Sequence, residues 1–403
     1  MSLAQNVEFL RRLPKLNGIV GWEDFGRNLR PTGRSPLVET TDFGSNPGDL
    51  RMFSFVPASL QPAPALVVVL HGCGQSAAGY DLGAGWSTLA KRYGFALLMP
   101  EQQSSNNGRG CFNWFNPEDT ARDRGEACSI RQMVGRMLGD HGIEPGRVFV
   151  TGLSAGGAMT SVMLATYPEI FAGGAIIAGL PFGVATNVRE ALSGMFQSPS
   201  RPASELGDLV REASNHKGPW PKISVWHGSA DRTVNPANAN EIAKQWLDVH
   251  HLPSAPMSVG TVDGYPHQVW WNAEGETVVE SYTITDMAHG TPLGIADNDE
   301  RYGAQGAFLI EAGISSSYHI AGFFGLTQRI QLPKADTAEA LAEASKEAAA
   351  APSMSTRSPS PAASLRPLAT PPRRSEVPHQ PRRRGIDVGD VITRALTAAG
   401  LMK

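Results

Sequence analysis

Short apolar runs, each followed by a turn rich in glycine or polar residues, divide the middle of this chain into buried strands. Residues 66–70 are apolar throughout, residues 223–226 are mainly apolar, and residues 277–284 alternate between apolar and polar positions with many β-branched side chains. A strand that is apolar on both faces is typical of a parallel sheet covered by helices on each side. Residues 236–246 form a helix-prone segment after one of these strands. The pattern predicts one α/β domain with a mostly parallel central sheet.

The pattern changes towards both ends of the chain. Residues 1–48 are expected to be an irregular N-terminal segment, and residues 49–332 the α/β domain, which opens with a strand at 51–56. Residues 333–403 are a tail that is first rich in alanine and then in proline and arginine, and that ends in a short amphipathic helix at 386–401. Because the tail has too few apolar residues to fold alone, we expect it to be disordered.

Composition limits the range of partners. The 403 residues include 41% hydrophobic side chains, enough for one sizeable core, and the net charge of −3 argues against a nucleic-acid partner. No apolar stretch is long enough to form a transmembrane segment. Residues 1–20 carry Arg11, Arg12 and Lys15 and lack an uninterrupted apolar core. We therefore recognise no secretory signal and expect a cytoplasmic protein, or one exported by a route without that signature.

The most informative motif is Gly152-Leu153-Ser154-Ala155-Gly156, which lies between an apolar run and a stretch of small residues. Strand, sharp turn and helix in this order lift the Ser154 hydroxyl above the sheet edge, beside a helix N-terminus. The turn needs small flanking residues because its backbone is crowded. We interpret Ser154 as a nucleophile; the alternative is an ordinary turn at a strand–helix junction.

A serine hydroxyl at neutral pH needs a base and an orienting carboxylate. Asp231 follows the strand at 223–228, and His289 follows the strand at 277–284. The chain order serine, aspartate, histidine is that of α/β-hydrolases, which predicts their three-layer sandwich. Asp231 has an alternative role as a turn or helix-cap residue. Of the other histidines, His227 ends a strand and is interpreted as a packed or supporting group.

The glycine-rich turn at residues 71–75, directly after the strand at 66–70, is a candidate oxyanion site. Its backbone N–H groups can face a developing negative charge. The amide of Ala155, the residue after Ser154, would supply a second donor. The alternative is a plain glycine turn between a strand and a helix.

Several segments together are more specific than the serine motif alone, above all the Cys-x-Asn-Trp-Phe element and the His-Gly-Cys turn. They are Leu70-His71-Gly72-Cys73-Gly74-Gln75, Tyr93-Gly94-Phe95, Pro100-Glu101-Gln102, Cys111-Phe112-Asn113-Trp114-Phe115, Gly152-Leu153-Ser154-Ala155-Gly156-Gly157-Ala158, Ala165-Thr166-Tyr167-Pro168, and Trp226-His227-Gly228 with Asp231. On these segments, over about residues 53–324, the chain resembles the polyhydroxyalkanoate (PHB) depolymerase-like esterases. That family is related to carbohydrate esterases that remove feruloyl and acetyl groups.

The resemblance implies that Ser154, Asp231 and His289 form a catalytic triad, with the amides of Cys73 and Ala155 as oxyanion hole. It implies a serine esterase that hydrolyses short-chain polyhydroxyalkanoate polyester, or its oligomers, through an acyl-enzyme. A feruloyl or acetyl-carbohydrate esterase is the alternative. A non-catalytic granule-binding protein is an alternative of another class, which the apparently complete triad speaks against.

The resemblance also bears on the three cysteines. Secreted family members can bridge cysteines that match Cys73 and Cys111, which would leave Cys128 unpaired. Three reduced, buried thiols are the alternative. Gly74 and Phe112 depart from commoner family residues, which leaves substrate preference open.

The remaining expectations concern ligands. Trp114 and Trp226 are candidate apolar contacts for the substrate, and Gln75 is a candidate polar contact. The sequence contains no metal or dinucleotide motif, so we expect neither a metal nor a cofactor. The tail could attach the enzyme to a polymer granule or an anionic surface. A solvated tail without a partner is the alternative.

Overall fold

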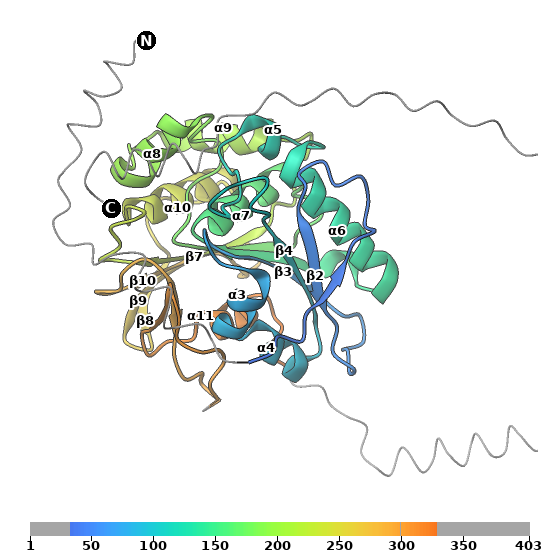
Figure 1. The fold of residues 1–403 in the computed structure, drawn as a ribbon. Helices are drawn as coiled ribbons and strands as arrows, with labels where there is room; N and C mark the ends of the chain where they lie inside the picture. Colours follow the sequence, from blue (N-terminus) through green and yellow to red (C-terminus); the bar gives the residue numbers. More distant parts are fainter. Residues whose placement is uncertain (1–32, 299, 329–403) are drawn as a thin grey trace, which may run out of the picture. The chain divides into compact units, whose positions relative to one another are not determined.

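One sheet of ten strands forms the frame of the domain (Figure 1). The computed structural model describes residues 33–298 and 300–328. The strands, in their order across the sheet, are β1 (Val38–Thr40), β2 (Arg51–Phe55), β4 (Ala96–Glu101), β3 (Leu66–Leu70), β5 (Val148–Leu153), β6 (Gly173–Ile177), β7 (Lys222–Gly228), β10 (Thr277–Ile284), β9 (Tyr265–Trp271) and β8 (Ser258–Val262). The strands from β4 to β10 in this order are parallel, and antiparallel strands complete both edges. The predicted, mostly parallel sheet is confirmed.

Alternate residues of the central strands enter two separate cores. Leu66 and Val68 of β3 lie in one core, and Val67 and Val69 lie in the other. Helices α6, α7 and α10 cover the first core, and α3, α4 and α11 cover the second (Figure 1). The helices are α3 (Ala77–Ala84), α4 (Trp86–Tyr93), α5 (Pro117–Thr120), α6 (Gly125–His141), α7 (Ala155–Thr166), α8 (Val188–Gln197), α9 (Ala203–Glu212), α10 (Ala237–Val249) and α11 (Ser316–Phe323). This is the three-layer sandwich that the sequence predicts.

The winding of the chain reverses at β3, which has β4 on one side and β5 on the other. In open α/β sheets the crevice beyond the carboxyl ends of the strands, near such a reversal, is where sites form. The turns after β3, β5, β7 and β10 all leave the sheet at the carboxyl ends of these strands, which form one edge of the sheet. A small parallel pair, β11 (Thr291–Leu293) and β12 (Leu309–Glu311), follows the last of these turns.

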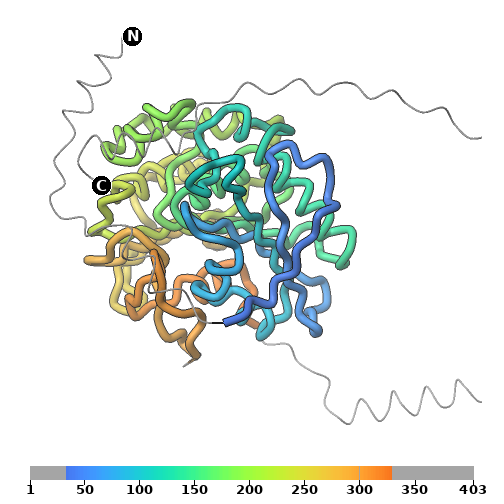
Figure 2. The backbone as a smooth tube through the Cα atoms, viewed as in Figure 1, coloured from blue at the N-terminus to red at the C-terminus, as the bar shows by residue number. Residues whose placement is uncertain are grey.

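The N-terminal boundary differs from the prediction. Residues 38–40, inside the segment expected to be irregular, form β1 and pair with β2 along one edge of the sheet (Figure 2). A strand of three residues is too short for its alternation to be recognised in a sequence. Residues 1–32 and the predicted tail, with its terminal helix, lie outside the described residues. No described helix is long and apolar enough to cross a membrane.

Candidate active site

Ser154 occupies the sharp turn between β5 and α7. Its backbone has φ 58° and ψ −117°, a conformation that L-residues rarely adopt and that stores strain. A Cβ on Gly152 would collide with the backbone of Gly156, and a Cβ on Gly156 would collide with the carbonyl group at the end of β3. The Ser154 N–H donates to the Ile177 carbonyl at 2.9 Å, which fastens the turn to β6. The glycines of the motif are therefore needed for space, as the sequence predicts.

Asp231 and His289 are hydrogen-bonded to each other, with His289 Nδ1 at 2.7 Å from Asp231 Oδ2. The Asp231 side chain is fully buried. Its Oδ1 accepts the N–H groups of Thr233 at 2.8 Å and Val234 at 2.9 Å. Burial raises the pKa of Asp231, but hydrogen bonds from the imidazoles of His227 and His289 outweigh it and hold the pKa well below its usual range. The group is a carboxylate that can orient an imidazole.

The loops that carry these two side chains are fastened to each other. Ser229 N–H donates to the Ile284 carbonyl at 2.9 Å, and Ala230 N–H donates to the Met287 carbonyl at 3.0 Å. Gly228 allows this close approach, because a Cβ there would collide with the Met287 carbonyl. Since β7 and β10 pair in parallel, the two loops start side by side. This is why residues 58 positions apart in the sequence meet.

The turn of Ser154 reaches the same edge through β6, which separates β5 from β7. Ser154 N–H bonds to the last residue of β6, and the next residue, Ala178, donates to the Trp226 carbonyl of β7 at 2.8 Å. The structure thus brings Asp231 and His289 into contact and places Ser154 at the same sheet edge.

The side chain of Gln75 holds the turn after β3. Its carbonyl oxygen accepts the Gly72 N–H at 2.8 Å, and its amide donates to the Ala307 carbonyl at 3.1 Å. N–H groups in the first turn of a helix lack partners within the helix, and Ala155 is the first residue of α7. Among the residues that the structure describes, neither the Ala155 nor the Cys73 amide donates to a protein acceptor. Both remain available to an oxyanion.

Two further contacts fix this turn. Cys73 is joined to Cys111 by a disulfide, so the structure contains the bridged alternative. Buried His71 has Nδ1 at 2.8 Å from the Gly72 carbonyl, and its Nε2 accepts the Gln102 N–H at 3.1 Å. Burial lowers the pKa of His71. The ring is therefore neutral, with its proton assigned to Nδ1 by its two neighbours.

Comparison with known proteins decides the family. A sequence profile described as esterase PHB depolymerase matches residues 52–257. The chain belongs to this family. The poly(3-hydroxyalkanoate) depolymerase C of Paucimonas lemoignei is 47% identical over 291 residues, which are 72% of this chain and 70% of that protein. An acetylxylan esterase of Coprinopsis cinerea is 34% identical over 269 residues, or 65% of this chain and 70% of that protein.

A solved structure agrees with the fold of this PHB depolymerase-family esterase. The acetyl xylan esterase from Aspergillus awamori matches with a TM-score of 0.61 at 25% identity, and the match covers 72% of this chain and 99% of that one. The predicted family and the predicted enzyme class, a carboxylic ester hydrolase, are confirmed.

In this esterase, one of the three predicted substrate contacts, Trp226, lies in the core. Trp226 is fully buried and stacks on Tyr282 with ring centroids 3.8 Å apart, so it belongs to the core and not to a substrate pocket. Its position on β7 directs it into the core beneath α11 and not towards the sheet edge. Gln75 accepts the Gly72 N–H in the oxyanion turn and donates to the Ala307 carbonyl, and its contact with substrate stays a prediction. Trp114 is buried with its ring edge-on to Phe115, and its contact with substrate stays a prediction.

Sequence analysis missed one residue, which supports the loop that contains Cys111. Glu126 of α6 is wholly buried and accepts hydrogen bonds from Gln102 Nε2 at 2.6 Å and Asn113 N–H at 2.8 Å. Burial, together with the negative charge of Asp119, raises its pKa well above the usual range. Gln102 also donates to the Cys111 carbonyl at 2.9 Å. A glutamate in the first turn of a helix carries no sequence signal of burial, so nothing in the pattern indicates this role.

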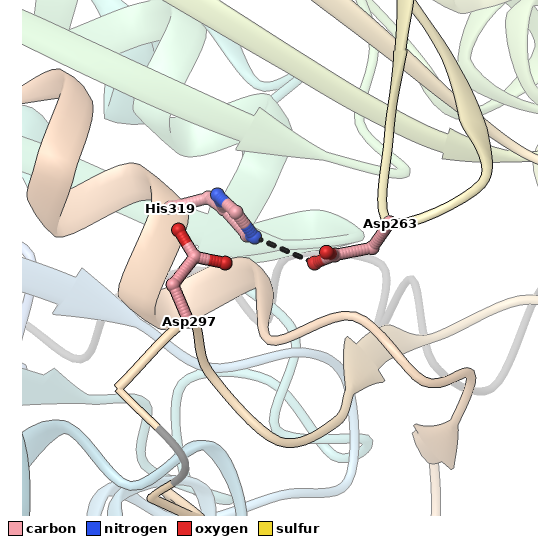
Figure 3. A group of neighbouring side chains, drawn as sticks. All are labelled: Asp263, Asp297 and His319. Atoms are coloured by element: carbon pink, nitrogen blue, oxygen red, sulfur yellow. Dashed lines mark hydrogen bonds and ion pairs between the residues drawn. The ribbon is translucent and has the colours of Figure 1, made fainter.

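A second group of titratable side chains gathers from three separate segments (Figure 3). Asp263 lies in the turn between β8 and β9, Asp297 in the loop after β11, and His319 on α11. Their potential ligand atoms all lie within 4.8 Å of one another, and His319 Nε2 is 2.9 Å from Asp263 Oδ2. Such a donor set is able to hold a divalent cation, although both aspartates are exposed. Acyl transfer by a serine triad does not require a metal ion. The three residues are far apart in the sequence, so no spacing motif indicates this cluster.

Proposed function

We propose that this esterase hydrolyses the ester bonds of short-chain polyhydroxyalkanoate polyester, or of its oligomers, with Ser154 as nucleophile. The observation that carries the proposal is the hydrogen bond between His289 and the buried carboxylate of Asp231, at the sheet edge where Ser154 occupies its strained turn. Because His289 Nδ1 is held by Asp231, its Nε2 is the nitrogen left to act as base.

The reaction proceeds by acyl transfer. Ser154 Oγ attacks the ester carbonyl carbon while His289 Nε2 takes the hydroxyl proton, and Asp231 stabilises the imidazolium. The electron pair of the carbonyl moves to its oxygen, where the amides of Cys73 and Ala155 donate to the negative charge. One such donor is worth roughly a hundred- to a thousandfold in rate.

The tetrahedral intermediate then collapses, and the alcohol leaves with the proton from His289. Water, deprotonated by the same imidazole, attacks the acyl-enzyme carbonyl. A second collapse releases the hydroxy acid and returns the proton to Ser154 Oγ. Every proton in this cycle passes through His289.

Sequence similarity supports the polyester. The Paucimonas lemoignei protein, named as a poly(3-hydroxyalkanoate) depolymerase, is 47% identical, against 34% for the Coprinopsis cinerea acetylxylan esterase. The triad contacts only the ester group, so acetyl and feruloyl esters are chemically open to the same site. The walls of the pocket therefore set the substrate.

The test compares three substrates on the native chain and on Ser154→Ala. We expect the native protein to hydrolyse p-nitrophenyl butyrate and to clear a suspension of amorphous poly(3-hydroxybutyrate), and the variant to do neither. Turnover of a feruloyl ester alone would move the substrate to carbohydrate esters. Equal activity of variant and native protein would refute Ser154 as the nucleophile.

Attachment to granules through the tail remains a prediction, because residues 329–403 lie outside the described residues. If the tail tethers the enzyme, deletion of residues 352–403 lowers activity on particulate polymer and spares soluble esters. Equal loss, or no loss, on both substrates would contradict the tether.

The compartment also remains a prediction. The cytoplasm is the expected compartment, whereas disulfides such as Cys73–Cys111 persist mainly in oxidising compartments. Alkylation of free thiols in protein taken directly from separated cell fractions distinguishes the two. Labelling of all three cysteines supports the cytoplasm, and labelling of Cys128 alone supports an oxidising compartment.

A further inference from the structure

A second imidazole, that of His227, lies against the Asp231 carboxylate besides that of His289. His227 Nε2 lies 3.2 Å from Asp231 Oδ2, the same oxygen that His289 Nδ1 approaches at 2.7 Å. The side chain of His227 is 3% exposed and that of Asp231 is 0% exposed, so water does not compete for this oxygen. A carboxylate oxygen has two lone pairs and can accept from both rings.

The neighbours of His227 assign its tautomer. Nε2 also lies 3.0 Å from the carbonyl oxygen of Val234, and because both groups near this nitrogen are acceptors, it carries the proton. Nδ1 is buried and has no hydrogen-bond partner among the described residues. A proton added to Nδ1 would have no acceptor. His227 therefore presents its N–H at Nε2 to these two acceptors.

The Nε2–H group of His227 both holds the loop after β7 and acts on the charge of the Asp231 carboxylate. His227 is the last residue but one of β7, and Val234 lies just beyond Asp231 in the following loop. The Nε2–H group donates to the Val234 carbonyl and lies beside Asp231 Oδ2, which closes this loop onto the strand. The same N–H withdraws part of the carboxylate charge that would otherwise act on His289.

We propose that His227 is a positioning residue of the triad, which fixes the Asp231 carboxylate and moderates its pull on the His289 proton. The inference rests on the proposed function, since it requires that Asp231 orients the catalytic base.

Few other ionisable groups can change the pull of the Asp231 carboxylate on the His289 proton. Among the described residues, the ionisable side chains with the largest effect on the Asp231 carboxylate are those of His227 and His289. Arg232 and Asp286, in the two adjoining loops, are exposed. On β10, the residue that pairs with His227 is Thr283, and Glu280 faces Ser224 instead.

The experiment replaces His227 by leucine and by glutamine in the full chain. His227→Leu removes the donor, whereas the amide of His227→Gln reaches about as far as Nε2 and keeps it. With p-nitrophenyl butyrate, we expect kcat of His227→Leu to fall about tenfold, the rate equivalent of one hydrogen bond to a charged group. KM should change little. The acidic limb of kcat/KM against pH should move to higher pH, because Asp231 then acts more strongly on His289. His227→Gln should keep kcat and the position of the acidic limb close to their native values.

His250→Leu is the matched control. His250 Nε2 lies 3.0 Å from the Pro221 carbonyl, so this variant also loses one bond from a packed histidine to a backbone carbonyl, but away from Asp231. It should lower the melting temperature without moving the pH limb. If His227→Leu does not fold, His227→Asn is compared with His227→Gln, since the shorter amide does not reach Oδ2.

The outcomes separate the two proposals. Activity that survives Ser154→Ala refutes the proposed function. If Ser154→Ala is inactive but the variant without the His227 donor is folded, keeps kcat within threefold and shows an unmoved or lowered limb, only the positioning role is overturned. The low-field proton resonance of the His289–Asp231 hydrogen bond gives a readout that is independent of activity, and it should shift in His227→Leu and not in His250→Leu.

Discussion

Cys73 and Cys111, which lie 38 residues apart, are joined by a disulfide that ties the turn after β3 to the loop before α5. The bridged turn is the one that presents the Cys73 amide at the candidate oxyanion site. A covalent tie therefore holds part of the site that the hydrogen bonds of Gln75 and His71 also hold.

The disulfide is expected to contribute to stability and to rate. Replacing Cys73 and Cys111 together by alanine should lower the free energy of unfolding by roughly 2–4 kcal/mol, because the unfolded chain regains the freedom of a long loop. The rate should fall as well, since the oxyanion turn loses its tie. Urea denaturation and kcat on a soluble ester measure the two effects. Cys128→Ala removes the free cysteine and should leave both unchanged.

Asp231→Asn tests the carboxylate directly. The amide keeps the volume but presents the wrong pattern of donors to His289, so the imidazole loses its productive tautomer, and kcat should fall about ten-thousandfold. The KM for p-nitrophenyl butyrate should change far less. A loss below about tenfold would mean that Asp231 is a turn residue, the alternative that the sequence also allows.

Two glycines with opposite surroundings test the shape of the serine turn. Gly156→Ala would drive a methyl group into backbone carbonyls at the end of β3, which should cost about 1–3 kcal/mol of stability and most of the activity. Gly135 lies on the exposed face of α6, where an added methyl group would meet no described atom within 4 Å apart from its chain neighbours and the backbone of its own helix. Gly135→Ala should therefore stabilise the protein by up to roughly 1 kcal/mol. Thermal unfolding of both variants measures the contrast. A harmless Gly156→Ala would contradict the tight turn.

Buried Glu126 predicts a pH dependence of stability. Its folded-state pKa is raised, so its contribution is fully present below the ordinary pKa of a glutamate and is lost as the pH rises through the raised folded-state value. The melting temperature should therefore decline with increasing pH over that range. Glu126→Gln should flatten this decline, even if the substitution changes the melting temperature at every pH. Glu169→Gln, which removes a surface partner of Arg122, should leave the slope unchanged. The same slope in Glu126→Gln and the native chain would show that another group is responsible.

Much of the central fold follows from local pattern. The strands at residues 66–70 and 277–284 have the bounds that their apolar and alternating positions predict, and the motif around Ser154 is enough to identify both structural glycines of its turn. The order of nucleophile, acid and base is also sufficient to select Asp231 and His289, which the structure joins.

The features that local pattern does not predict depend on packing between distant segments. The substrate contact predicted for Trp226 is wrong because a residue near a strand end can face either the site edge or the core, and only the packing of Tyr282 against it decides. Glu126 has no local signal of burial, and the orphaned nitrogen of His227 becomes visible only when the neighbours of both ring atoms are known. Short edge strands such as β1 exist because β2 is there to pair with them.

The central claim is that Ser154 is the nucleophile, and covalent labelling tests it most directly. The native chain is treated with a fluorophosphonate, which forms a stable bond with an activated serine, and the labelled peptide is identified by mass spectrometry. We predict one adduct per chain, on Ser154, with labelling abolished in Ser154→Ala and strongly slowed in Asp231→Asn. An adduct on another residue, or equal labelling of Ser154→Ala, would contradict the account.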